Sequence, residues 1–230
     1  MVDRSILYHY PLDPFCRRVR LTLLEKGIPI GLILEKTWER RPSFLEKNPL
    51  GTVPLLVEPD GHTLAGANAI CEYINEIRTA PNLLGETPRG RAEVRRLTEW
   101  FDTVFYHDAV YPILLERVIK VVQTKEAPSS YMIRVGRENL EKYLKYVDWL
   151  AGRRTYLGGR SLSFADLAGA SHLSVLDYLG ELDWGQLEEG ATWYAKMKSK
   201  PTFAPLLADN VAGVLPSEHY RNLDFFGRDE

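Results

Sequence analysis

Cysteine is scarce in this chain of 230 residues. Only Cys16 and Cys71 occur, without a pairing pattern, which is typical of proteins kept in a reducing compartment. The chain also lacks any uninterrupted apolar run near the ~18 residues that a membrane-spanning helix needs. The charged N-terminal segment Met-Val-Asp-Arg-Ser has no apolar stretch of the kind found in a signal peptide. We therefore expect a cytoplasmic protein without membrane insertion.

An excess of charge of either sign is also missing. The 29 Lys and Arg residues nearly balance the 31 Asp and Glu residues, and the net charge is −2. This balance lacks the electrostatic footprint of a general nucleic-acid binder. The five histidines are isolated from one another and from the cysteines, so no metal-ligand spacing exists. We expect neither a nucleic-acid partner nor a metal site.

What remains is the composition of an ordinary globular chain. Hydrophobic residues make up 45% and charged residues 26% of the sequence. These values exclude collagen-like repeats, coiled coil and general disorder. The length allows one large domain or two small ones.

The first 78 residues alternate short apolar runs with segments of helical periodicity. An Asp13-Pro14 pair opens the first helix, Gly27 closes it, and Asp60-Gly61 turns a hairpin. Strands are expected at residues 6–9, 30–34, 54–57 and 63–64, with further helices at 42–47 and 68–77. The order β-α-β-α-β-β-α predicts a thioredoxin-like α/β domain over residues 1–78, with its first two strands parallel.

Beyond this domain the strand pattern stops. Residues 79–90 are rich in Pro and Gly and are expected to form a linker. An all-helical (all-α) domain is expected over residues 91–212, followed by a tail without periodicity at 213–230. Ser163 and Asp166 form a capping signature directly before an apolar helix, so Asp166 is expected to be structural. Other helices are expected at 94–105 and 133–150, with one or two short ones in 193–210.

Two sequence features together resemble the glutathione transferase family. They are the segment Asn48-Pro-Leu-Gly-Thr-Val-Pro-Leu-Leu56 and the Ser163-to-Asp166 cap, and the resemblance covers about residues 5–212. It implies the glutathione transferase fold, with Pro54 as the cis-proline that begins the third strand.

At the position where that family activates the thiol of glutathione, this chain has Asp13. The family uses Ser, Tyr or Cys there. An ionised carboxylate cannot donate a hydrogen bond to a thiolate, and its charge opposes the thiolate. Asp before Pro is, however, a favourable helix N-cap. We interpret Asp13 as structural and expect no catalytic residue.

A second departure lies at the start of the third helix. The family holds the γ-glutamyl end of glutathione with a carboxylate and a hydroxyl, and here the same slot is Gly66-Ala67. Losing both hydrogen bonds weakens glutathione binding by roughly 10²-fold or more. Backbone groups at Val53 and Pro54 remain. The sequence thus predicts a vestigial glutathione site and no cofactor.

Cys16 belongs to Asp13-Pro-Phe-Cys16, which also resembles a glutaredoxin-like Cys-Pro-Phe-Cys motif whose nucleophilic first cysteine is replaced by Asp13. Because Cys16 falls on the apolar face of its helix, we expect it to be a buried small hydrophobe, and Cys71 likewise. The alternative is a glutathione-dependent transferase or thiol reductase that uses an unorthodox residue such as Cys16 or Tyr10.

Two features are candidates for partner binding. Trp38 is an aromatic residue among charges, and it either covers the short helix at Phe44 or is an exposed anchor for a protein partner. The tail is too apolar for a solvated end, so it either packs on the body or binds something else. We expect a partner-binding surface formed by Trp38 and the tail residues Tyr220, Leu223, Asp224, Phe225 and Phe226.

Several segments resemble one branch of the family, the transferase-like bacterial cell-division proteins that bind the tubulin-like GTPase FtsZ. That branch implies a non-catalytic homodimer at the division site that binds FtsZ filaments and favours their curvature, bundling and constriction. A generic interaction protein with another partner is a further alternative. The resemblance depends on residues 8–16, 38–41, 70–73, 172–179 and 219–225.

Overall fold

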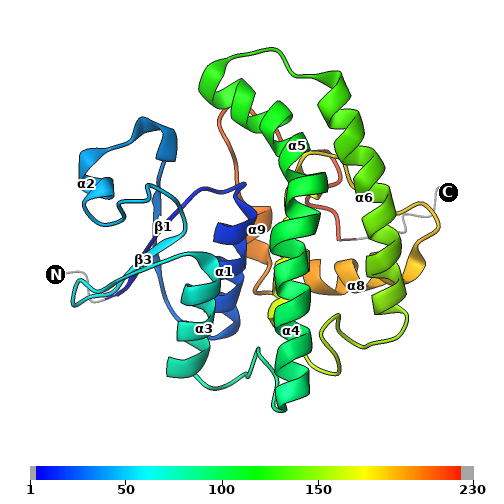
Figure 1. The fold of residues 1–230 in the computed structure, drawn as a ribbon, viewed down its shortest axis with the longest axis horizontal. Coiled ribbons are helices and arrows are strands. Elements are labelled where there is room, and N and C mark those ends of the chain that lie inside the picture. Colours follow the sequence, from blue (N-terminus) through cyan, green and yellow to red (C-terminus); the bar gives the residue numbers. More distant parts are fainter. Residues whose placement is uncertain (1–3, 224–230) are drawn as a thin grey trace.

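The computed structural model describes residues 4–223. Its N-terminal part contains a four-stranded sheet in the order β2-β1-β3-β4 (Figure 1). β2 pairs with β1 in parallel, whereas β1 with β3 and β3 with β4 are antiparallel. This arrangement confirms the predicted thioredoxin-like topology. The strands are β1 (Ile6–His9), β2 (Gly31–Leu34), β3 (Leu55–Val57) and β4 (Thr63–Ala65).

Helices cover both faces of this sheet. The helices α1 (Pro14–Glu25) and α3 (Ala67–Ile77) pack on the face to which the buried Leu7 and His9 point. The short α2 (Pro42–Leu45) covers the other face, where the Phe44 ring lies 5.5 Å from the Tyr8 ring. Leu7 and His9 point to one face and Tyr8 to the other because successive side chains of a strand alternate between the two faces of the sheet.

After α3, every secondary-structure element assigned within residues 4–223 is a helix, as predicted. A long rod begins with α4 (Pro88–Trp100) and continues through two π-helical segments and α5, with α6 beside it (Figure 1). All 15 residues of α7 are buried, so α7 is the centre of this part. The remaining bounds are η2 (Phe101–Val110), α5 (Tyr111–Leu114), η3 (Leu115–Thr124), α6 (Ser130–Ala151), α7 (Phe164–Tyr178), α8 (Glu188–Lys198) and α9 (Ala204–Leu207).

The predicted capping box at the start of α7 is present. The Ser163 backbone N–H donates to Asp166 Oδ2 at 3.0 Å, and the Asp166 carboxylate also accepts from the Trp193 indole at 3.0 Å. Asp166 is fully buried, and a buried carboxylate is tolerated only when hydrogen bonds satisfy it. Its structural role is therefore confirmed.

Helix α1 packs against α7 and joins the sheet to the helical part. Three of its arginines are buried in or beside this junction. Arg18 forms an ion pair with Asp102 on η2 at 2.6 Å, and Arg20 forms one with Asp209 at 2.7 Å. Breaking such a buried pair by removing one partner leaves an uncompensated charge, so these pairs fix how the two parts are joined.

Three local features complete the fold. Helix α4 begins at Pro88, inside the segment expected to be a linker, because the Thr87 hydroxyl caps it by accepting from the Gly90 N–H at 3.0 Å. The Val53-Pro54 bond is cis, as the resemblance implies, and the Ala80-Pro81 bond is cis as well. No helix within residues 4–223 has both the length and the apolar character of a membrane span.

Candidate functional site

Asp13 is the N-cap of α1. Its Oδ1 accepts a hydrogen bond from the Cys16 backbone N–H at 2.7 Å, and Pro14 is the first residue of the helix. Burial raises the pKa of Asp13 to about 6, although the backbone hydrogen bonds from Cys16 and Phe15 oppose the rise. Asp13 therefore combines the capping role expected from the sequence with a carboxylate whose charge is poorly solvated.

Asp13 lines a small cleft between the sheet and the helical rod. The cleft has a volume of about 110 Å³. Its walls come from the segment after β1, from η1 (Thr37–Glu39), from the loop before β3 and from the rod. The lining residues are Tyr10, Leu12, Asp13, Thr37, Trp38, Val53, Tyr106, Leu114, Val118, Ile119, Val122 and Gln123.

Trp38 forms one wall of this cleft and is half-buried. Its ring contacts the Tyr10 ring edge to face, with 5.4 Å between the centroids. The ring that pairs with Phe44 is that of Tyr8. The structure thus brings Trp38 and Asp13 together in one site, whereas the sequence pattern gave no reason to connect these two residues.

The other residues of the predicted vestigial glutathione site lie at the start of β3 and the start of α3. The Gly66 backbone N–H donates to the Pro54 carbonyl at 3.1 Å, and Gly66 precedes α3 with φ 88°, a backbone conformation that favours glycine. Ala67 begins α3 and is buried. Val53 lines the cleft, while Gly66 and Ala67 bring no polar side chain to it.

Both cysteines are buried and free. Burial raises the pKa of the Cys16 thiol well above its usual value, and the Asp13 carboxylate raises it further. The Cys71 thiol lies 3.3 Å from the Thr22 hydroxyl, and burial raises its pKa as well. Since the thiolate is the reactive form, both residues behave as the small buried hydrophobes that the sequence predicts.

The placement of Tyr220 on an exposed partner-binding surface is wrong. Tyr220 is 0% exposed. Its ring lies 5.0 Å from the Tyr178 ring, and its hydroxyl donates to the Leu206 carbonyl at 2.8 Å. Arg17 in turn donates to that hydroxyl at 3.1 Å. The tail up to Tyr220 therefore packs on the body, because a buried phenol ring with a satisfied hydroxyl contributes to the core.

Four other tail residues are expected on the partner-binding surface, and the structure describes one of them, Leu223. Leu223 is 48% exposed, which agrees with a surface role. Asp224, Phe225 and Phe226 lie outside the described residues. Leu215, eight residues earlier in the chain than Leu223, is 90% exposed.

Sequence reasoning missed two contributors to the site. Tyr106 of η2 lines the cleft from the rod, and its ring contacts the Phe15 ring at 4.9 Å. Burial is the main cause that raises the pKa of Tyr106, and the charge of Asp13 adds to it. Arg17 holds the segment that lines the cleft, since its Nε donates a hydrogen bond to the carbonyl of Pro11, between Tyr10 and Leu12, at 2.6 Å. The three arginines within residues 17–20, on a helix with many apolar residues, are the signal that could have shown a buried network.

Comparisons with known proteins agree with this fold and site. The model of the glutathione S-transferase N-terminal domain matches residues 14–77. FtsZ-localized protein A of Caulobacter vibrioides is 43% identical over 227 residues, which is 97% of this chain and 99% of that protein. The solved structure of FzlA from C. crescentus has a TM-score of 0.94 at 42% identity and covers 96% of this chain and 100% of that one.

A second solved structure is equally similar. It is described as a glutathione S-transferase from Rhodospirillum rubrum F11, with a TM-score of 0.94, 44% identity, and coverage of 96% of this chain and 100% of that one. Similarity at this level extends over both the sheet and the helical part. The chain therefore belongs to the glutathione S-transferase superfamily and, within it, to the family of FtsZ-localized protein A.

Proposed function

We propose that this protein is a non-catalytic member of the superfamily that binds FtsZ filaments at the division site and regulates their curvature and bundling. The single observation that carries the proposal is the 43% identity to FtsZ-localized protein A over 97% of the chain. The site supports it, since Asp13 occupies the thiol-activating position and Gly66-Ala67 brings no polar side chain for the γ-glutamyl group.

The proposed filament-binding surface includes Trp38. A half-buried tryptophan that lines a cleft and contacts the Tyr10 ring edge to face has the rigidity and area of an interface anchor. Leu223 is proposed as a second apolar contact, together with Asp224, Phe225 and Phe226 beyond it. Anchors of this kind typically cost ~2 kcal/mol or more each when truncated to Ala.

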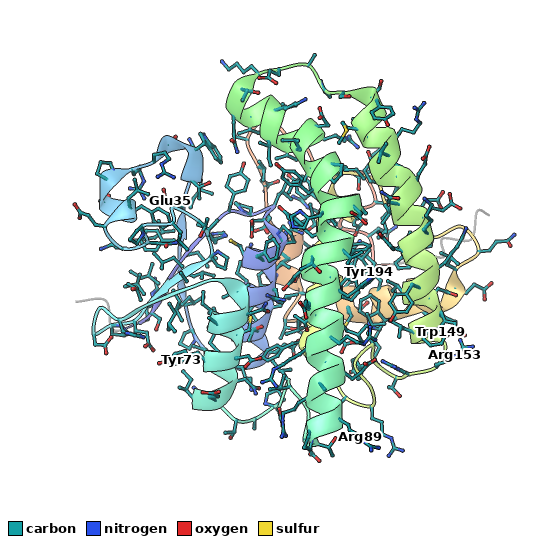
Figure 2. The ribbon with its side chains drawn as sticks, in the orientation of Figure 1. Glu35, Tyr73, Arg89, Trp149, Arg153 and Tyr194 are labelled. Carbon is teal, nitrogen blue, oxygen red and sulfur yellow. The ribbon has the colours of Figure 1, made fainter. Side chains whose placement is uncertain are left out.

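Co-pelleting with GTP-assembled FtsZ tests the surface. Trp38→Ala should weaken binding by roughly 30-fold, the equivalent of ~2 kcal/mol. The matched control is Trp149→Ala. Trp149 is 47% exposed and lies on α6, on the far side of the rod from the sheet, with the Arg153 guanidinium over its ring (Figure 2). Equal pelleting of both variants would show that Trp38 is not part of the filament-binding surface.

We also propose a homodimer. In a two-fold dimer the filament-binding surface is presented twice, so one dimer bridges two filaments or two subunits of one filament. Exposed apolar side chains on the N-terminal part, Leu50 at 75% and Ile77 at 57%, support an interface between copies. Sedimentation velocity over a concentration series tests it, and a monomer at all concentrations would contradict it.

A glutathione-dependent enzyme is the second candidate. It is favoured by the 44% identity to a structure described as a glutathione S-transferase and by the cis Val53-Pro54 backbone, which lies at the cleft. Turnover of a standard electrophile with glutathione would support this candidate over the non-catalytic one.

A further inference from the structure

The capping hydrogen bond at the start of α1 does not require the charge of Asp13, although a negative charge at a helix N-terminus is favourable. An N-cap needs only an oxygen that accepts from the helix backbone, and Asn caps as well as Asp does. Here Oδ1 binds the Cys16 N–H at 2.7 Å. Burial nevertheless raises the pKa of Asp13 to about 6, and the nearby Asp102 carboxylate raises it further. At neutral pH this group is mostly ionised and faces an unfavourable environment, which a cation would relieve.

The neighbouring cations do not supply that relief. Arg18 pairs with Asp102 at 2.6 Å, and Arg20 pairs with Asp209 at 2.7 Å. The Arg17 guanidinium donates hydrogen bonds to the Pro11 carbonyl, the Ser174 hydroxyl, the Tyr220 hydroxyl and the Asp209 carboxylate. Among residues 4–223, the ion pairs of these three arginines all go to carboxylates other than Asp13. Asp13 accepts hydrogen bonds from Cys16 and Phe15, but none of these three arginines pairs with it, so a cation that enters the cleft can be its counter-ion.

The cleft walls match the rest of a basic side chain. Tyr10, Trp38 and Tyr106 line it with aromatic rings, whose faces attract an ammonium or guanidinium group. The rod also contributes aliphatic side chains to the cleft, which suit a methylene stem. At about 110 Å³ the cleft is smaller than the roughly 300–1,000 Å³ of pockets for drug-sized ligands. It accommodates the end of one side chain. The aliphatic residues are Leu114, Val118, Ile119 and Val122.

We propose that this cleft binds the cationic side chain, Lys or Arg, of the protein partner that docks beside Trp38, with Asp13 as its counter-ion. The identity of the partner rests on the proposed function, whereas the chemistry of the cleft does not. The Asp13 position, at which the superfamily activates a thiol, would thus select a basic residue on a protein surface.

A small cation tests the chemistry without any filament. The probe is n-butylguanidinium, with 1-pentanol as an uncharged comparison, and binding is followed by the NMR shift of the Trp38 indole N–H. We expect the cation to bind at least tenfold more tightly than the alcohol. Asp13→Asn and Asp13→Ser, which both keep a capping oxygen, should weaken the cation at least tenfold. Binding that is equal in the wild type and both variants would overturn the proposal.

The matched control is Asp60→Asn. Asp60 is exposed in the turn between β3 and β4, at the opposite end of the strands from the cleft, and its side chain accepts from the His62 N–H as an Asn side chain also would. This variant has the same change of charge and should bind the probe as the wild type does. An equal loss in Asp60→Asn would show that only the overall charge matters, which would overturn the proposal.

Acidification gives a second readout. The cation needs ionised Asp13, so its affinity should fall about tenfold between pH 8 and pH 5 in the wild type and stay level in Asp13→Asn. The groups around Asp13 are Tyr10, Cys16, Asp102 and Tyr106, with His107 and His172 in contact with the Tyr106 ring. Their titration is common to both proteins, so an equal pH dependence in the two would contradict the role of Asp13.

Filament binding then separates the two proposals. If wild-type protein pellets with FtsZ and Asp13→Asn pellets at least tenfold more weakly, the cleft receives a basic residue of FtsZ. If Asp13→Asn pellets like the wild type while Trp38→Ala does not, the proposed function stands and the cation inference is overturned. If even the wild type does not pellet, the proposed function fails, and the n-butylguanidinium titration alone decides the chemistry of the cleft.

Discussion

The guanidinium of Arg17 donates a hydrogen bond to the hydroxyl of Tyr220, with 3.1 Å between Nη1 and the phenol oxygen. The same guanidinium donates through Nε to the carbonyl of Pro11, which lies between two cleft residues, Tyr10 and Leu12. One buried arginine therefore joins the C-terminal tail to the segment that forms the Asp13 cleft. The tail up to Tyr220 is part of the support of the site.

Two truncations separate the structural and surface parts of the tail. Ending the chain after Pro216 removes Tyr220 from the core and should destabilise the fold by ~3–5 kcal/mol, as removal of a buried aromatic ring does. Ending it after Leu223 keeps this ring, so this protein should be more stable than the first truncation by about the same ~3–5 kcal/mol. Urea unfolding of both proteins measures this, and equal stability of the two would contradict the core role of Tyr220.

The second truncation also tests the proposed tail contact. Removing Asp224, Phe225 and Phe226 should weaken co-pelleting with FtsZ filaments by roughly 30-fold or more, since interface anchors typically cost ~2 kcal/mol or more each. Leu223→Ala should have a smaller effect in the same direction. Its control is Leu215→Ala, at a leucine that is 90% exposed. Undiminished pelleting of the truncated chain would rule out the tail as a contact.

The capping role of Asp13 is isolated by comparing two substitutions. Asp13→Asn keeps an oxygen for the Cys16 N–H, and Asp13→Ala does not. Asp13→Ala should therefore be about 1 kcal/mol less stable than Asp13→Asn. Both lack the charge, so the difference between them reports the cap alone. Equal unfolding free energies in urea would show that the hydrogen bond at the start of α1 contributes nothing.

The charge of Asp13 gives a pH dependence of known sign. Its pKa is about 6 in the fold, against an ordinary value of 3.8. Between these values the folded state holds the proton more tightly than the unfolded state. The contribution of this carboxyl group to the free energy of unfolding therefore falls as pH rises from about 4 to above 6. Asp13→Asn should gain stability relative to wild type across this window. If the difference in unfolding free energy between Asp13→Asn and the wild type stays constant from pH 4 to pH 7, the raised pKa is contradicted.

Glutathione should leave the melting temperature unchanged. A ligand at 100 times its dissociation constant stabilises a protein by ~2.7 kcal/mol, which a thermal scan detects easily. At a few millimolar glutathione we expect no shift, because Gly66 and Ala67 bring no polar side chain to the cleft and Asp13 opposes a thiolate. A clear upward shift would favour the enzymatic candidate instead.

Local signals in the sequence predicted most of the fold. Asp13 before Pro14, and Ser163 with Asp166, each act within three residues, and the structure has both caps. Tyr220 was misplaced because its burial depends on Arg17, 203 positions away, and no periodicity reports such a contact. The meeting of Trp38 with Tyr106 in one cleft likewise depends on how the helical rod packs against the sheet, which a linear pattern does not encode.

Co-sedimentation of the wild-type protein with GTP-assembled FtsZ, with and without millimolar glutathione, tests the central claim most directly. A non-catalytic filament-binding protein should pellet saturably with the filaments, and glutathione should not change the binding curve. Failure to pellet above an inert control protein, or pelleting only when glutathione is present, would contradict the claim.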